Sequence, residues 1–383
     1  MPWRVPFLWY LPVVICLQGY AQGVDPSYST ISHPYESSAS RSTECTRLRA
    51  TMMVHMSLPD QRPAILDPSR ILPEAREAGY SFVRVYDVVD TTNTEIVRRL
   101  TRGEPCERTE LGELSVFTTL YMTAGKGRMD RAWTAPAGTC LATSIVVRPH
   151  AGVGQQLPIT SYHWLTMLAG LSVLDVWREL GLDAALKWPN DLVIRGRKAC
   201  GILALLLSEP AQVPEEKRQM SIVVGIGQNL NMREDQVPVP TATSALIQRG
   251  EPVDNHVVLN RMLTIFARRY REFVSVGGDP QKTLLCGQSL LDQARAATVT
   301  LGAEVSVHLP DGRIVTGVAT DLDAQGRILI RDTTGAVQAY SVGDIEHLRP
   351  ADGSYGNFYP AHRQEDSPTL TPSEITPNTS AKA

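Results

Sequence analysis

The stretch from Ala185 to Leu203, ALKWPNDLVIRGRKACGIL, places a short polar segment between two apolar runs. The Pro-Asn-Asp sequence at 189–191 predicts a turn, because proline fixes φ and Asn or Asp can hydrogen-bond its own backbone. The apolar residues on either side predict two strands, so the whole stretch reads as strand, turn and strand. A plain hairpin accounts for the turn, but it does not account for the lysine and tryptophan directly before it.

Lys187 is the residue of this stretch that most needs an explanation. A lysine between apolar runs is costly to bury, so its ammonium group either reaches water or meets an anion. Asp191 and Lys198 stand close by in the sequence, which also permits a surface ion pair that contributes little to stability. The residues alone leave these alternatives open.

Composition sets broad limits on the protein. With 383 residues the chain is long enough for two or three domains, each with a buried core. An apolar content of 43% and a charged content of 20% are ordinary for a globular protein. The net charge of -3 gives no electrostatic argument for binding nucleic acid or an anionic membrane. Partners must therefore be inferred from individual sites.

The cysteines are scattered, with no Cys-x-x-Cys pair and no histidine at metal-ligand spacing. Two of them stand in apolar runs, where a thiol behaves as a small hydrophobic group. The sequence therefore predicts buried free thiols rather than disulfides. The six are Cys16, Cys45, Cys106, Cys140, Cys200 and Cys286.

The first fifty or so residues differ in composition from the rest. Residues 1–23 contain one arginine and an apolar stretch of export-signal length, too short and too interrupted by proline to span a bilayer. The Ser- and Thr-rich sequence that follows has no periodicity and predicts disorder. Met52, Met53 and Met56 precede the first regular pattern, so we expect the natural start there and a mis-assigned start upstream. The alternative is a genuine export signal or anchor.

Regular patterns begin near residue 75. The best predicted helix, 158–182, has apolar residues at three- and four-residue steps from Trp164 to Trp177, and Gly181 stands where a helix commonly ends. The other predicted helices are 90–100 and 254–274. Besides the strand pair around KWPND, the predicted strands are 80–89, 114–122, 139–149, 199–207 and 220–231.

The last regular part of the chain, 298–349, differs in kind. It consists of short alternating runs separated by Asp311-Gly312, Gln325-Gly326 and Thr334-Gly335. Such dipeptides between alternating runs predict hairpins and hence a small antiparallel barrel. The expected organisation is an N-terminal extension at 1–74, a mixed α/β domain at 75–292, a barrel at 293–350 and a disordered tail at 351–383.

A second polar cluster, AGKGRMDR at 124–131, has the composition of a phosphate-binding loop. Its glycines let backbone N–H groups approach a ligand, and its lysine and arginines supply cationic donors. A solvated basic turn is the alternative interpretation. The cluster does not match the Walker P-loop and does not open a Rossmann helix.

Together these blocks resemble the biotin protein ligase family. The resemblance rests on DTTNT at 90–94, GKGRMDRAWTAPAG at 125–138, KWPND at 187–191 and RKACGIL at 197–203, followed by the small barrel. It covers about residues 75 to 349, and the KWPND block is its most specific part. The type implied is monofunctional, without a helix-turn-helix domain. The fold implied is α+β: a mixed central sheet with flanking helices, similar to class II synthetases, plus a C-terminal SH3-like β-barrel.

The resemblance also implies a reaction in two steps. Biotin's carboxylate attacks the α-phosphate of Mg-ATP to give biotinyl-5'-AMP, and a lysine of a biotin carboxyl-carrier domain then attacks that anhydride. Lys187 and Arg128 are the catalytic residues implied, since a fixed cation offsets the crowding of two anions. A cytoplasmic monomer or homodimer is expected, with no nucleic acid and no stable membrane association.

The implied binding residues fall into three groups. Those for biotin are Thr91, Thr92, Asn93, Met122, Lys126, Gly127, Arg128 and Lys187. Those for ATP and the adenylate are Gly125, Lys126, Arg128, Arg131, Trp133, Asn190 and Asn229. The residue for Mg²⁺ is Asp191.

Three positions depart from the family's pattern. Met122 stands where a biotin-contacting glutamine is usual, so a polar contact is lost or is supplied by Thr123. Lys126 replaces an arginine, and an ammonium holds phosphate less rigidly than a planar guanidinium. Asp130 replaces a glycine and adds negative charge to a loop that must meet polyphosphate.

Three other functions remain to be distinguished. A lipoate ligase shares the implied architecture, but its Arg-Arg-x-Ser-Gly-Gly-Gly type of block is missing. A repressor needs a helix-turn-helix before residue 75, and no helical periodicity stands there. A non-catalytic sensor of biotin or nucleotide could dispense with Lys187, so the presence of this lysine favours an enzyme.

Overall fold

The computed structural model describes residues 14–15, 64–102, 110–149, 157–208, 220–309, 311–341 and 347–350. The expectations about an export-like segment, a start near Met52 and a disordered tail lie outside the described residues.

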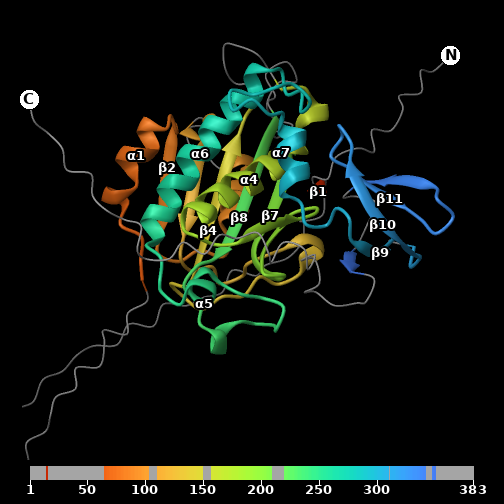
Figure 1. Ribbon diagram of the computed structural model, residues 1–383. Helices are drawn as coiled ribbons and strands as arrows, with labels where there is room; N and C mark the ends of the chain where they lie inside the picture. The colour runs from red at the N-terminus through yellow and green to blue at the C-terminus, as the bar shows by residue number, and fades with distance from the viewer. Residues whose placement is uncertain are drawn as a thin grey trace, which may run out of the picture. The chain divides into compact units, whose positions relative to one another are not determined.

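A mixed sheet forms the centre of the larger domain (Figure 1). Within the described residues its strand order is β2-β3-β4-β8-β7-β6-β5, with β2 parallel to β3 and every later neighbour antiparallel. A short strand, β1 (Val14–Ile15), lies parallel to β7 beside Leu205 and Leu206. The other strands are β2 (Phe82–Tyr86), β3 (Ser115–Thr119), β4 (Cys140–Val147), β5 (Ala184–Lys187), β6 (Asp191–Ile194), β7 (Arg197–Ser208) and β8 (Met220–Asn229).

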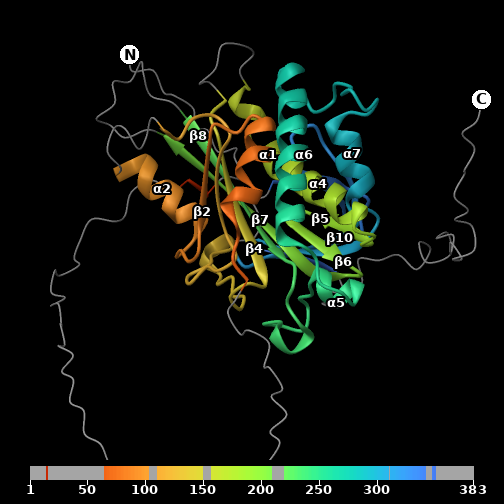
Figure 2. The ribbon, with the colours of Figure 1, turned by 90° about the vertical axis from the view of Figure 1, so that its left-hand side faces the viewer.

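Helices cover both faces of this sheet (Figures 1 and 2). Ile145 of β4 belongs to the core cluster under α4 and α6, whereas its neighbour Val146 belongs to the cluster under α2. Because successive strand residues point to opposite faces, two covered faces explain the unbroken apolar run of β4. The helices are α1 (Leu72–Glu77), α2 (Thr92–Arg102), α4 (Trp164–Glu179), α5 (Ala245–Arg249), α6 (Asn255–Ser275) and α7 (Leu290–Ala297). Short 3-10 turns are η1 (Pro68–Arg70), η2 (Arg128–Asp130), η3 (Ile159–Ser161) and η5 (Glu234–Gln236).

The structure confirms the strand–turn–strand prediction at 185–203, and the predicted helix at 254–274 is α6 within one residue at each end. The folded part begins earlier than residue 75, which corrects the predicted boundary: Leu66 and Ile71 are already buried, and α1 starts at Leu72. Periodicity could not show this segment, because six residues with a proline near the helix start are too few to establish a helical pattern.

A small antiparallel sheet follows the larger domain, as expected. In the described residues its order is β12-β11-β10-β9-β13. Gly312, Gly326 and Gly335 have φ of 83°, 66° and 89°, so the three predicted hairpin glycines adopt the left-handed region that suits them. The strands are β9 (Glu304–His308), β10 (Ile314–Leu322), β11 (Ile328–Arg331), β12 (Val337–Tyr340) and β13 (His347–Pro350), hereafter the C-terminal β domain. The predicted α+β class is confirmed.

Cys140 and Cys200 are buried free thiols, as predicted. Cys286 is also free but exposed, which corrects the expectation of burial for this residue. It lies in a turn before α7 rather than in a strand, so no sheet covers it. The other three cysteines lie outside the described residues. None of the helices in the described part of the chain is long and apolar enough to cross a membrane.

Candidate functional site

One face of β4, β7 and β8 carries most of the residues that the sequence singled out. In the strand register, Gly201 of β7 lies opposite Gly227 of β8, and Leu203 lies opposite Gly225. Residues two apart in a strand point to the same face, so Gly225 and Gly227 open onto one surface. Side chains from the start of α2 and from the basic loop (Gly125–Trp133) occupy the space above these glycines.

The first group over this face is the amide cluster, which we define as Thr92, Asn93 and Ser144. Ser144 Oγ lies 2.6 Å from both Thr92 Oγ1 and Asn93 Oδ1. Ser144 is the donor in both contacts, and because its hydroxyl has one proton, that proton is shared between the Thr92 and Asn93 side-chain oxygens. Asn93 Nδ2 donates to the Leu203 carbonyl at 3.1 Å. The cluster therefore ties the start of α2 to β4 and β7, and its polar groups are held in fixed directions.

Gly225 leaves the space that Asn93 fills. A Cβ atom built on Gly225 would lie 2.4 Å from Asn93 Oδ1, far inside van der Waals contact. A glycine inside a strand weakens it, and such glycines commonly mark a close approach of another group. Here the approaching group is the Asn93 amide.

Thr91 has a different task from its two neighbours. Its Oγ1 accepts a hydrogen bond from the Thr94 backbone N–H at 2.8 Å, which caps the N-terminus of α2. Asp90 in turn accepts from the Thr91 N–H through its side chain at 2.8 Å. The DTTNT block thus contains residues that shape the helix start and residues that face the sheet.

The second group over the face centres on Trp133, at the end of the basic loop. Cβ atoms built on Gly201 and Gly227 would lie 2.9 and 3.1 Å from the Trp133 ring, so the indole rests on these glycines. Its Nε1 donates to Cys140 Sγ at 3.4 Å, and Lys198 Nζ lies 5.4 Å from the ring centroid. Burial raises the pKa of the Cys140 thiol to about 11, which keeps it a neutral packing partner.

Backbone hydrogen bonds close the basic loop on itself. The Gly127 N–H donates to the Arg131 carbonyl at 2.7 Å, and the Trp133 N–H donates to the Gly125 carbonyl at 2.8 Å. Before the loop, the N–H groups of Thr123 and Ala124 donate to residues 89 and 90. The loop therefore stands next to the DTTNT block, although the bonded residues are 34 positions apart in the sequence.

Arg128 joins the basic loop to the KWPND turn. Its Nη1 donates to Asn190 Oδ1 at 3.4 Å, a long bond. Asn190 is fixed in turn, because its Nδ2 donates to the Ile202 carbonyl at 2.8 Å. Burial lowers the pKa of the Arg128 guanidinium, and the nearby Asp191 carboxylate opposes that shift. The half-buried guanidinium thus places a cation of the basic loop beside the KWPND turn.

Lys187 is 5% exposed at the end of β5, opposite Asp191 of β6 in the register. Asp191 Oδ1 forms an ion pair with Lys198 Nζ at 2.6 Å. The side chains of these two are 10% and 27% exposed, so the pair is more buried than the surface pair considered from the sequence. Two lysines and Arg128 thus surround one carboxylate, which gives this end of the sheet a positive excess.

The remaining predicted residues are less closely connected. Asn229 is buried, and its Nδ2 donates to the Thr243 carbonyl at 3.0 Å, which fastens the end of β8 to the segment before α5. Lys126 and Arg131 are exposed on the basic loop. Met122 packs against Gly125, where a built Cβ would meet its Cε at 3.3 Å. Asp130 has a φ of 54°, the conformation that the family's usual glycine adopts at least cost.

The sequence did not single out Ser144 or Gly225 as site residues, and it suggested for Lys198 only a surface ion pair with Asp191. A serine inside the buried run CLATSIVV was the available signal, because a buried hydroxyl needs a partner. Its partners lie 51 and 52 positions earlier, so no local pattern could name them.

The assignment of Asp191 to Mg²⁺ stays a prediction. No group of three or more His, Cys, Asp or Glu side chains that could hold a metal occurs among the described residues. Asp191 is already paired with Lys198, and the surrounding charges are positive. A dication would meet repulsion here unless it arrived with an anionic ligand.

Two family models match the chain. Residues 85–229 match the model of the Biotin/lipoate A/B protein ligase family, and residues 300–348 match that of the Biotin protein ligase C terminal domain. A Mycobacterium tuberculosis protein named biotin–(acetyl-CoA-carboxylase) ligase is 31% identical over 276 residues, which cover 71% of this chain and 91% of the relative. The bifunctional ligase/repressor of Escherichia coli is 27% identical over 279 residues, covering 70% and 75% respectively.

A solved structure supports the fold. Biotin protein ligase from Aquifex aeolicus, in complex with biotin and ATP, aligns with a TM-score of 0.53 at 22% identity, over 71% of this chain and all of the other. Fold and sequence thus define a protein of the biotin and lipoate ligase class. Within that class, the chain belongs to the biotin protein ligase family.

Proposed function

We propose that this chain joins biotin to a lysine of a biotin carboxyl-carrier domain in two steps. The biotin carboxylate attacks the α-phosphate of ATP, which forms biotinyl-5'-AMP and releases pyrophosphate. The carrier lysine's neutral ε-amine then attacks the acyl carbon of the anhydride, which forms an amide and releases AMP and a proton. The class of carrier follows from the relatives, which are named for acetyl-CoA carboxylase.

The observation that carries this proposal is the buried Lys187 on a strand end with a second lysine and Arg128 nearby. Bringing a carboxylate to an α-phosphate crowds two anions, and fixed cations in a partly buried site offset that repulsion. We assign Lys187 to the space between the two reacting groups. Arg128 and the glycines of the basic loop then cover the phosphate and keep water from the anhydride.

We assign the amide cluster to the biotin end of the site. The ureido ring of biotin presents a carbonyl oxygen and two N–H groups, and a hydroxyl and an amide with fixed directions can satisfy them. Trp133 supplies a flat apolar wall on the same face of the sheet. One sheet face would thus hold the ring at the α2 end and the adenylate at the Trp133 end.

We propose that Mg²⁺ arrives bound to the phosphates of ATP, since Asp191 is already ion-paired. ATP is abundant in the cytoplasm, so we place the reaction there. The identity of the carboxylase depends on a docking surface rather than on this site.

The test is the intact mass of a biotin carboxyl-carrier fragment after incubation with the full chain, biotin and Mg-ATP. We expect an increase of one biotinyl group, and no increase when lipoate replaces biotin. The Lys187→Ala variant serves as the matched control. Stabilisation of the folded chain by biotin without pyrophosphate release or carrier labelling would instead identify a sensor.

A further inference from the structure

Two tryptophans of the larger domain donate hydrogen bonds to one turn of the C-terminal β domain. Trp164 Nε1, at the start of α4, donates to the Ala324 carbonyl at 3.0 Å. Trp188 Nε1, in the KWPND turn, donates to the Gly326 carbonyl, also at 3.0 Å. Both indoles are 1% exposed. The β10–β11 turn (Asp323–Arg327) therefore presents two carbonyl groups to two buried donors.

Hydrogen bonds within the β10–β11 turn fix its shape independently of the tryptophans. Asp323 accepts backbone N–H bonds from Gln325 and Arg327 at 3.0 and 2.9 Å, and it accepts the Arg327 Nε bond at 2.6 Å. Gly326 has a φ of 66°, and a Cβ there would lie 3.1 Å from His163 Cδ2. Backbone conformation and lack of space both favour glycine at this position. The carbonyl directions are thus set by the turn itself.

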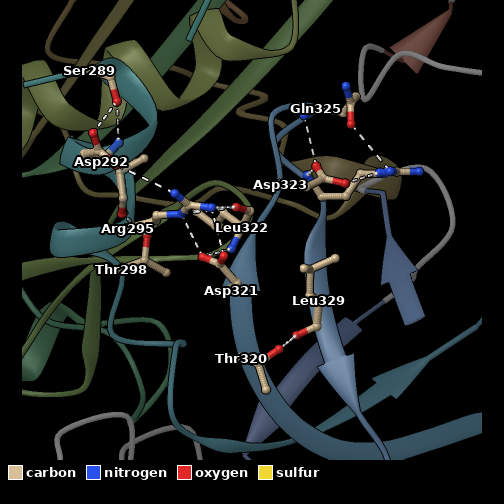
Figure 3. A network of polar contacts seen from close by, with 12 residues as sticks. Ser289, Asp292, Arg295, Thr298, Thr320, Asp321, Leu322, Asp323, Gln325 and Leu329 are labelled. Atoms are coloured by element: carbon tan, nitrogen blue, oxygen red, sulfur yellow. Dashed lines mark hydrogen bonds and ion pairs between the residues drawn. The ribbon is translucent and has the colours of Figure 1, made fainter. Parts of the chain in front are cut away.

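A salt-linked arginine holds the β10–β11 turn in place. Arg295 of α7 donates to the Leu322 carbonyl at 2.8 Å and forms an ion pair with Asp321 at 2.7 Å (Figure 3). Figure 3 shows its side chain reaching from α7 toward the end of β10, one residue before the turn begins. The turn's position is therefore defined relative to α7 of the larger domain.

The backbone around Lys187 is held by the segment that leads into the C-terminal β domain. β5 is the last strand of the central sheet in the described residues, and residues 298–300 lie along its free side. The Val299 N–H donates to the Leu186 carbonyl at 2.9 Å, and the Trp188 N–H donates to Thr300 Oγ1 at 3.1 Å. Lys187 stands between these two bonded residues.

We propose that the β10–β11 turn and Thr300 position Lys187 for attack of the biotin carboxylate on ATP, through the indole and backbone N–H groups of Trp188. This inference rests on the proposed function, because it assigns Trp188 as a positioning residue for the Lys187 ammonium. A strand end with its side open would let the lysine move, and a small displacement of a charged group at a reacting centre is costly. The C-terminal β domain thereby acts on the first half-reaction.

Trp164 supplies a matched control, because it loses an equivalent bond to the same turn but does not adjoin Lys187 in the chain. Trp188→Phe and Trp164→Phe each remove one indole N–H and leave one carbonyl of the turn without its donor. The measurements are kcat and KM for biotin-dependent pyrophosphate release, and Tm for both variants. We expect Trp188→Phe to lower kcat about fivefold, the scale of one hydrogen bond, with KM for biotin unchanged. Trp164→Phe should lower Tm about as much as Trp188→Phe does, because each loses one hydrogen bond to the same turn. Its kcat should stay within about twofold of that of the unaltered chain.

Equal kcat values for the two variants, or a Trp188→Phe effect confined to KM, would overturn the proposal. If Trp188→Phe does not fold, Thr300→Val and Thr300→Ser decide in its place: the first removes the hydroxyl that accepts the Trp188 N–H, and the second keeps it. We expect kcat to fall with valine and to return with serine. Absence of pyrophosphate release by the unaltered chain would instead reject the proposed function.

Discussion

The amide cluster and the basic loop lie over the same sheet face but are built in opposite ways. The cluster is buried and uncharged, and its Asn93 is hydrogen-bonded at 2.6 Å to Ser144 of β4 and at 3.1 Å to Leu203 of β7. The loop carries exposed Lys126 and Arg131, and the Arg128–Asn190 hydrogen bond from it to the KWPND turn is 3.4 Å long. Two of its residues, Met129 and Asp130, also have positive φ.

This difference matches two different tasks. A rigid group of neutral donors and acceptors recognises a ring at little cost in entropy, because its directions are set before binding. A loop that covers a reactive anhydride must open to exchange substrate and product, so an exposed segment between Gly125 and the packed Trp133 suits it. Changes to the buried frame should therefore reduce chemistry or binding, whereas changes to the loop should alter retention of the intermediate.

The largest effect is expected from Lys187→Ala, which tests whether the buried frame carries the chemistry. We expect biotin-dependent pyrophosphate release to fall by about 10²-fold or more, since a fixed charge beside the reacting anions is lost. Lys187→Met keeps most of the side-chain volume and should show the same loss with a Tm close to that of the unaltered chain. Near-normal pyrophosphate release in either variant would reject the role assigned to Lys187.

Gly225→Ala tests the amide cluster. The added methyl group must displace Asn93, so we expect KM for biotin to rise about tenfold, the scale of one to two hydrogen bonds. The decisive measurement is the double variant with Asn93→Ala, in which the methyl group has room. We expect Gly225→Ala to add almost no further loss in that background. Fully additive losses would mean that Gly225 acts independently of Asn93.

Arg128→Gly tests the covering role of the loop. We expect pyrophosphate release to fall only several-fold, as for loss of a charge-assisted hydrogen bond, while free biotinyl-5'-AMP accumulates and labels bystander lysines. Filtration followed by mass spectrometry measures the released intermediate. Met129→Gly adds the same flexibility to the loop and keeps the guanidinium, so it should not increase release. Unchanged retention in Arg128→Gly would contradict a covering role.

Asp130→Gly should have the smallest effect. Glycine relieves the left-handed backbone cost of about 1 kcal/mol and removes a negative charge, so we expect KM for ATP to fall about twofold to fivefold. Asp130→Asn separates these causes, because asparagine tolerates this conformation but is neutral. If KM for ATP falls only in Asp130→Gly, the backbone conformation is the cause. If it falls equally in Asp130→Gly and Asp130→Asn, the negative charge is the cause. No change with either would remove Asp130 from the account of the loop.

The sequence predicted the elements of the site better than their connections. The KWPND turn, the strands around it and the hairpin glycines follow from local chemistry, and each lies where it was expected. The early start of the folded part and the exposed Cys286 were missed. Both depend on which distant surfaces cover a short segment, and a few residues of local pattern carry no such information.

The sequence by itself determined where the strands and the glycine-containing turns lie, because these depend on the period of the side chains and on backbone freedom within a few residues. The tertiary structure alone decided which polar groups meet. Ser144 bonds Asn93 across 51 residues, and Trp188 bonds Gly326 across 138. Such pairs depend on strand order and on how the C-terminal β domain docks. The energy of a buried hydrogen bond becomes available only after folding has removed both partners from water.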